Sequence, residues 1–102
     1  MYNIISFQWH AHDNLILVAC WSQTNGLIVS GGEDCRYKVW DATGHQLYSS
    51  NVGDYPITAI SWCYSSGNYF AVGSFNTIKL CDKNGVKLIL YYINLHAHTI
   101  DK

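Results

Sequence analysis

The sequence is poor in charged residues. Asp, Glu, Lys and Arg make up only 13% of its 102 residues, and six basic against seven acidic side chains leave a formal net charge of −1. It has no basic stripe and no polybasic cluster. Such clusters neutralise the phosphates of nucleic acids or bind acidic lipid headgroups. We therefore expect no nucleic-acid partner.

Long apolar runs and a secretory leader are also lacking. The longest apolar stretch, Leu88 to Leu95, falls far below the roughly 20 residues that cross a bilayer. The first ten residues carry neither a positive segment nor a small-residue cleavage site. We expect no membrane insertion and a cytoplasmic location.

Closely spaced cysteine pairs are missing as well. None of the four cysteines forms a CxxC motif, and three lie within alternating apolar runs. We predict free and mostly buried thiols in a reducing compartment, in place of disulfides or metal ligands. These residues are Cys20, Cys35, Cys63 and Cys81.

The chain does contain an internal repeat with an offset of 41 residues. Nine identities fall in 35 ungapped positions, where composition alone gives about two. A period near 40 is typical of WD-repeat propeller blades, and the apolar runs alternate as strands do. We predict an all-β fold of antiparallel, four-stranded WD-repeat β-propeller blades. The matching residues of the first copy are Asp13, Ile16, Trp21, Gly26, Gly32, Lys38, Asp41, Gly44 and Leu47.

The repeat divides the chain into blades. Residues 1–14 are expected to hold the outer strand of a preceding blade, from Ile4 to Trp9, and a connecting loop. Residues 15–55 form a first full blade, residues 56–93 a second, degenerate blade, and residues 94–102 match neither. The expected strands are Leu15 to Trp21, Leu27 to Gly31, Tyr37 to Asp41, Gln46 to Ser50, Ile57 to Trp62, Tyr69 to Ser74, Thr77 to Asp82 and Lys87 to Ile93.

Two blades and a fraction are too few for a closed ring, because propellers close with about four to eight blades. An open pair exposes apolar faces and unpaired strand edges. We therefore interpret the chain as a piece of a larger propeller protein. The alternative is self-association of this chain into a ring.

A polar set in the first blade has the spacing of the structural tetrad of WD repeats: His12, Ser30, Asp34 and Trp40. The imidazole can satisfy the buried carboxylate, and the Ser30 hydroxyl can accept the indole N–H of Trp40. A catalytic Ser-His-Asp set is the alternative. Nucleophilic serines occupy exposed, strained turns, whereas Ser30 is expected in mid-strand, so we predict a structural role.

In the second copy the same offset replaces all four polar residues together. Loss of the whole set is expected, since a half-satisfied buried network is worse than an apolar core. The second blade is therefore predicted to be held by packing alone. The replacements are Gly53, Ala71, Phe75 and Cys81.

Two histidine pairs lack a carboxylate or thiol at close ligand spacing, so we interpret them as loop and tail residues and expect no zinc site. They are His10 with His12, and His96 with His98. Three aromatic residues at strand spacing are predicted to pack within the blades and not to line a binding surface. These are Tyr64, Tyr69 and Phe75.

Several stretches resemble consecutive blades of a WD-repeat subunit of intraflagellar transport complex B. They are AHD (11–13), GGEDCRYKVWD (31–41), LYSS (47–50), PITAISW (56–62) and FAVGSFNTIKLCDKNG (70–85). Generic WD repeats do not carry this wording. The resemblance extends from Phe7 to Gly85. It implies a non-enzymatic scaffold at the ciliary base and in the cilium, which binds other subunits of the transport particle, supports cilium assembly and needs no cofactor or small-molecule substrate.

Two other function classes were weighed. A WD-repeat substrate receptor of a ubiquitin ligase often carries Trp-Asp-x-Arg after the third strand, whereas this chain has Trp40-Asp41-Ala42-Thr43. An enzyme would need a metal set, a glycine-rich phosphate loop or an exposed nucleophile. The sequence has none of these features, so we expect no catalytic activity.

Overall fold

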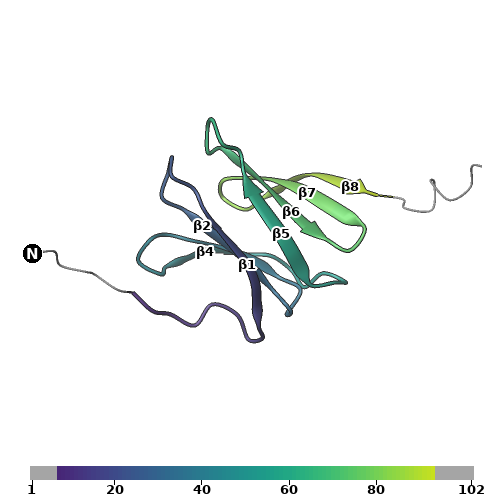
Figure 1. Ribbon diagram of the computed structural model, residues 1–102, viewed down its shortest axis with the longest axis horizontal. Helices are drawn as coiled ribbons and strands as arrows, with labels where there is room; N and C mark the ends of the chain where they lie inside the picture. Colours follow the sequence, from purple (N-terminus) through teal and green to yellow (C-terminus); the bar gives the residue numbers. More distant parts are fainter. Residues whose placement is uncertain (1–6, 94–102) are drawn as a thin grey trace, which may run out of the picture.

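The computed structural model describes residues 7–93, which form two four-stranded antiparallel sheets and no helix (Figure 1). The first sheet has the order β1-β2-β3-β4 and the second β5-β6-β7-β8. This arrangement confirms the predicted all-β fold of blades. The strands are β1 (Ile16–Trp21), β2 (Ile28–Gly32), β3 (Tyr37–Trp40), β4 (Gln46–Ser49), β5 (Ile57–Trp62), β6 (Tyr69–Ser74), β7 (Thr77–Asp82) and β8 (Lys87–Tyr92).

The strand bounds agree closely with the alternation of apolar residues. β5, β6 and β7 have the predicted bounds, and the other five strands differ by one residue at one or both ends. The expected outer strand from Ile4 to Trp9 differs more. Its described part, residues 7–9, pairs with no strand, and its remainder lies outside the described residues, as does the tail over residues 94–102.

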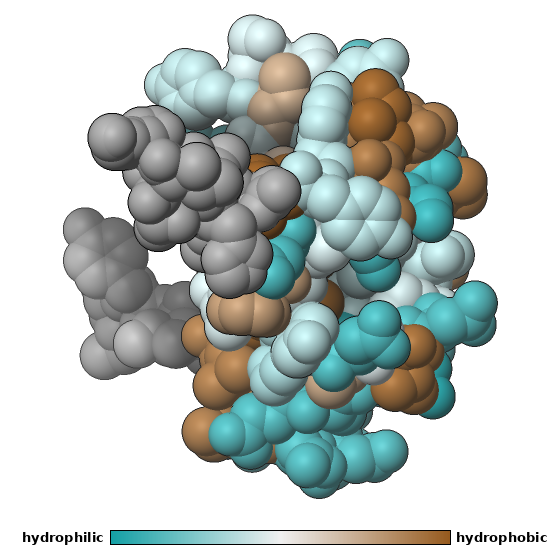
Figure 2. Space-filling model, turned by 90° about the vertical axis from the view of Figure 1, so that its right-hand side faces the viewer, coloured by the Kyte–Doolittle hydropathy of each residue, from teal (hydrophilic) through white to brown (hydrophobic). Residues whose placement is uncertain are grey.

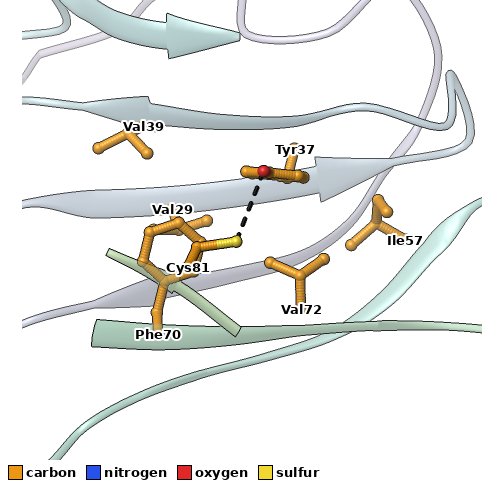
Figure 3. Close-up of a cluster of buried hydrophobic side chains, with 7 residues drawn as sticks. All are labelled: Val29, Tyr37, Val39, Ile57, Phe70, Val72 and Cys81. Carbon is orange, nitrogen blue, oxygen red and sulfur yellow. Dashed lines mark hydrogen bonds between the residues drawn. The ribbon is translucent and has the colours of Figure 1, made fainter. Parts of the chain in front are cut away.

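The core lies between the two sheets. The innermost strands β1 and β5 lie side by side (Figure 1), and the facing surfaces of the sheets meet behind them. Every second residue of β2 and β3 points at the second sheet, as the two-residue period of a strand requires. Seven side chains converge there (Figure 3): Val29, Tyr37, Val39, Ile57, Phe70, Val72 and Cys81.

The strand registers correct the alignment of the two copies. Ser30 on β2 lies opposite Lys38 on β3. Lys79, which follows Lys38 by 41 residues, lies opposite Val72 on β6. Val72 and not Ala71 is therefore the equivalent of Ser30, so the predicted equivalence of Ser30 with Ala71 is wrong.

Two compensating changes in loop length cause this shift. The turn before β2 closes with the Ser22 N–H donating to the Leu27 carbonyl, whereas the turn before β6 closes one residue later, from Cys63 to Tyr69. Four residues then join β2 to β3, but only two join β6 to β7. The insertion and the deletion cancel, so the offset of 41 holds on either side of β6 and hides the shift within it.

No helix of the described residues is long and apolar enough to cross a membrane.

Candidate functional site: the polar network of the first blade

The turn between β2 and β3 holds the acidic member of the candidate site. Asp34 accepts a hydrogen bond from the Arg36 backbone N–H at 3.2 Å, and Cys35 adopts a left-handed φ of 64° to close the turn. Gly32 lies so close to the segment before β1 that a Cβ atom there would be 2.7 Å from the Leu15 carbonyl oxygen. A glycine is needed at this approach, which fixes the turn beside the entering loop.

The structure brings all four predicted residues into one continuous chain of hydrogen bonds. The Trp40 indole Nε1 donates to Ser30 Oγ at 2.8 Å. Ser30 Oγ lies 2.7 Å from His12 Nε2, and His12 Nδ1 lies 2.8 Å from Asp34 Oδ2. Because an indole N–H can only donate, the Ser30 hydroxyl is left to donate to His12 Nε2. The neutral imidazole then carries its proton on Nδ1 and donates it to Asp34.

The network is almost fully shielded from solvent. The exposed fractions of His12, Ser30 and Trp40 are 4%, 4% and 5%. Among the described residues no buried side-chain nitrogen or oxygen lacks a hydrogen-bond partner. Burial of polar groups is costly unless they are paired. This set is paired completely, and it links the entering loop, β2, the β2–β3 turn and β3.

The carboxyl of Asp34 is held in its ionised form. Burial alone would raise its pKa, but the hydrogen bond from His12 and that from the Arg36 N–H outweigh this effect, and the charges of His12 and Lys38 add to them. The pKa of Asp34 therefore lies below its ordinary value. An ionised acceptor strengthens the bond that orients the imidazole.

The arrangement suits mechanical support better than nucleophilic chemistry. Ser30 is buried in mid-strand, and its oxygen is bonded to both Trp40 and His12. A nucleophilic serine needs an exposed oxygen next to an electrophile site. The site therefore has the geometry of a clamp within the blade.

The second sheet has no such network. Val72, the equivalent of Ser30, and Cys81, the equivalent of Trp40, are both buried in the core. The Cys81 thiol instead donates to the Tyr37 hydroxyl at 3.5 Å, and that hydroxyl donates to the Gly85 carbonyl at 2.8 Å. One hydrogen-bonded pair thus links the two sheets through the core, in addition to packing.

The remaining replacements are not brought together. Phe75 lies in the β6–β7 turn, 57% exposed, with its ring 5.1 Å from that of Tyr55. Gly53 lies outside the second sheet and donates its N–H to the Cys35 carbonyl at 2.8 Å. The predicted packing of Tyr64 within a blade is wrong, since this residue occupies the β5–β6 turn and is 95% exposed.

The thiols are free, as predicted, but the prediction that most are buried is wrong. Only Cys81 is buried, while Cys20, Cys35 and Cys63 are partly exposed. Cys35 and Cys63 lie in turns, where strand alternation says nothing about burial. Hydrogen bonds from Ser66 and Ser65 lower the pKa of the Cys63 thiol to about 7.

The histidine pairs remain loop residues where the structure describes them. His10 lies 3.5 Å from the carboxylate of Asp13, with both side chains exposed. Within residues 7–93 no group of three His, Cys, Asp or Glu side chains is placed to hold a metal ion. His96 and His98 lie outside the described residues.

Comparison with known proteins gives a close match over most of the chain. It is 54% identical over 78 residues to the "Intraflagellar transport protein 80 homolog" of Rattus norvegicus and to that of Mus musculus. The match covers 76% of this chain and 10% of each relative, so the chain spans about a tenth of their length. No protein-family model matches. The resemblance predicted from the sequence is confirmed over this stretch.

Proposed function

We propose that this chain, which is homologous to the intraflagellar transport protein 80 homologs over 78 of its residues, acts as a non-enzymatic scaffold in the intraflagellar transport particle, within complex B. It would present two blades to other protein subunits at the ciliary base and in the cilium, and so support cilium assembly. The observation that carries this proposal is the 54% identity, which extends over most of the chain.

The geometry supports a scaffold because the blades are rigid and carry exposed aromatic side chains at one end. Tyr55 and Phe75 lie there in an edge-to-face pair and are 48% and 57% exposed. An open cavity of about 430 Å³ adjoins them. Exposed aromatic groups on a rigid support are favoured at protein interfaces, where they supply contact area at low entropic cost.

We assign the network of His12, Ser30, Asp34 and Trp40 a structural role in this function. By fixing the first blade, residues 15–55, it would hold the aromatic end in one conformation. The second blade, residues 56–93, would rely on the apolar core and on the hydrogen bond from Tyr37 to Gly85. Residues 1–14 would serve as the entry to the first blade.

Affinity purification from ciliated cells tests this function. The tagged 102-residue chain is expected to recover complex B subunits. The double variant Tyr55→Ala/Phe75→Ala should recover less of them. Tyr64→Ala is the matched control, because it removes an exposed tyrosine at the opposite end of β5. Recovery of a cullin ligase without complex B subunits would contradict the proposal and favour a substrate receptor.

A further inference from the structure

The second sheet repeats, on its outer face, the surface with which the first sheet binds it. Tyr37 lies opposite Gly31 in the first sheet, and Ile78, which follows Tyr37 by 41 residues, lies opposite Gly73 in the second. Tyr37 is 2% exposed because the second sheet covers it, whereas Ile78 is 37% exposed. The equivalent surface of the second sheet therefore lacks the cover that the first sheet has.

This outer face of the second sheet consists of uncharged side chains. It is defined by strand pairing as Ala71, Gly73, Ile78, Leu80, Ile89 and Tyr91. Ile89 and Tyr91 are 43% and 52% exposed. Figure 2, which views the molecule from the side on which the second sheet lies, shows apolar patches open to solvent. Exposed apolar groups gathered on one sheet face favour association with a second surface.

The matching surface is present elsewhere in the same chain. Lys38 and Ser30 form a cross-strand pair on the outer face of the first sheet, and they correspond to Lys79 and Val72, which face the core. The outer face of the first sheet is thus equivalent to the surface that covers Tyr37. It is defined as Ala19, Ile28, Ser30, Lys38 and Trp40.

A groove of about 480 Å³ lies along this outer face of the first sheet, between it and the segment over residues 7–11. The segment contacts the sheet through Trp9 and Trp40, whose ring centroids are 5.8 Å apart. Trp9 backs onto Gly44 just as Tyr48 of β4 backs onto Gly85, the residue 41 positions later. The segment therefore occupies the place of an outer strand and leaves the groove beside it open.

The Lys38 side chain does not obstruct this groove with a free charge. Its Nζ donates to the Ala11 carbonyl at 2.8 Å. Ala19 and Ile28 line the floor of the groove beside Trp40. Both outer faces are thus mainly apolar, and each corresponds to one half of the interface that already exists between the sheets.

We propose that the 102-residue chain self-associates head to tail, with the outer face of the second sheet of one copy packing on the outer face of the first sheet of the next. The contact would repeat, between copies, the packing of the first sheet on the second within a copy. Heterologous contacts of this kind form rings when their rotation closes. Three copies would bring together about six blades, within the range of about four to eight that closes a propeller. The proposal stands apart from the transport function.

Sedimentation velocity on complementary variants tests this contact. The unmodified chain is expected to form discrete oligomers as its concentration rises. Ile78→Lys blocks one outer face and Ala19→Lys the other, so each variant alone should be monomeric. An equimolar mixture should form a dimer and nothing larger, because only one intact face of each kind remains. Val86→Lys is the control: it is 50% exposed in the β7–β8 turn and should associate normally.

Three results would overturn the proposal: an unmodified chain that stays monomeric, an Ala19→Lys variant that still associates, or a mixture that stays monomeric. Continued association of Ala19→Lys would indicate a symmetric contact between two second sheets instead. Circular dichroism checks that each variant keeps its strands. If Ile78→Lys does not fold, Ile89→Lys on the same face replaces it in the mixture.

Discussion

The Trp40 indole donates its N–H to the Ser30 hydroxyl at 2.8 Å, across adjacent strands of the first sheet. This bond sets the direction of every other bond in the network. Ser30 must donate to His12, and His12 must then donate to Asp34. A single buried indole thus selects the tautomer of the imidazole 28 positions before it in the sequence.

Removing the carboxylate at the end of this chain should destabilise the first blade. Asp34→Ala leaves the His12 Nδ1–H without its acceptor, and an unsatisfied buried donor costs about 1–3 kcal/mol. We expect the free energy of unfolding in urea to fall by that amount. Asp13→Ala is the control, since the side chain of Asp13 is 91% exposed and should change stability little. Equal effects of the two substitutions would contradict the structural role.

The contribution of Asp34 should also depend on pH. Its pKa in the folded protein lies below the ordinary value of 3.8, so folding favours the ionised form. The stabilisation is fully present above the unfolded pKa and is lost as the pH falls through the folded pKa. The difference in unfolding free energy between the unmodified protein and Asp34→Ala should therefore be constant near neutral pH and shrink below about pH 4. A difference that grows on acidification would be inconsistent with an ionised Asp34.

Ser30 and Trp40 should be energetically coupled. Ser30→Ala leaves the indole N–H unpaired, whereas Trp40→Phe removes that donor, so the serine matters less once the indole is gone. We expect a coupling energy of about 0.5–3 kcal/mol in a double-mutant cycle measured by urea unfolding. Additive effects of the two substitutions would mean that the 2.8 Å bond contributes nothing to stability.

The sequence predicted most of this site because each member has its own local signal. Ser30 and Trp40 fall within alternating runs, and Asp34 falls in the turn between them. The register shift of β6 could not be predicted in the same way. One residue is gained before the strand and one is lost after it, so the offset of 41 is restored by Lys79 and an ungapped comparison conceals the change.

Burial was the other quantity that the sequence could not provide. Alternation identifies which residues share a face of a strand, but not whether another element covers that face. Tyr37 and Ile78 occupy equivalent positions and differ from 2% to 37% exposed, solely because a sheet covers one of them. Turn residues such as Tyr64 and Cys63 carry no alternation at all, so their exposure depends on the fold alone.

The hydroxyl of Tyr37 should contribute to the contact between the blades. Tyr37→Phe keeps the ring in the core but removes the donor to the Gly85 carbonyl. Leaving that buried carbonyl unpaired should cost about 1–3 kcal/mol in urea unfolding. Tyr64→Phe, at a 95% exposed position, provides the matched control and should change nothing measurable. A Tyr37→Phe protein as stable as the control would exclude a role for this bond.

Cys63 should be the most reactive thiol of the described residues. The Ser66 and Ser65 hydrogen bonds lower its pKa to about 7, whereas burial raises the pKa of Cys81. Because the thiolate is the nucleophile, the rate of alkylation of Cys63 by iodoacetamide should reach half its maximum near pH 7. Ser66→Ala should move that midpoint upward. Faster labelling of Cys81 than of Cys63, read by peptide mass spectrometry, would contradict this environment.

The most direct test of the two-blade account is the hydrogen exchange of the tryptophan indoles, followed by NMR. The Trp40 N–H is bonded to the buried Ser30, and the Trp62 N–H crosses between the sheets to the Cys20 carbonyl at 3.1 Å. Trp21 is 60% exposed and serves as the internal reference. The account predicts that the Trp40 and Trp62 protons persist in deuterated water after that of Trp21 has exchanged. Loss of all three at the same rate would contradict both the buried network and the packing of one sheet on the other.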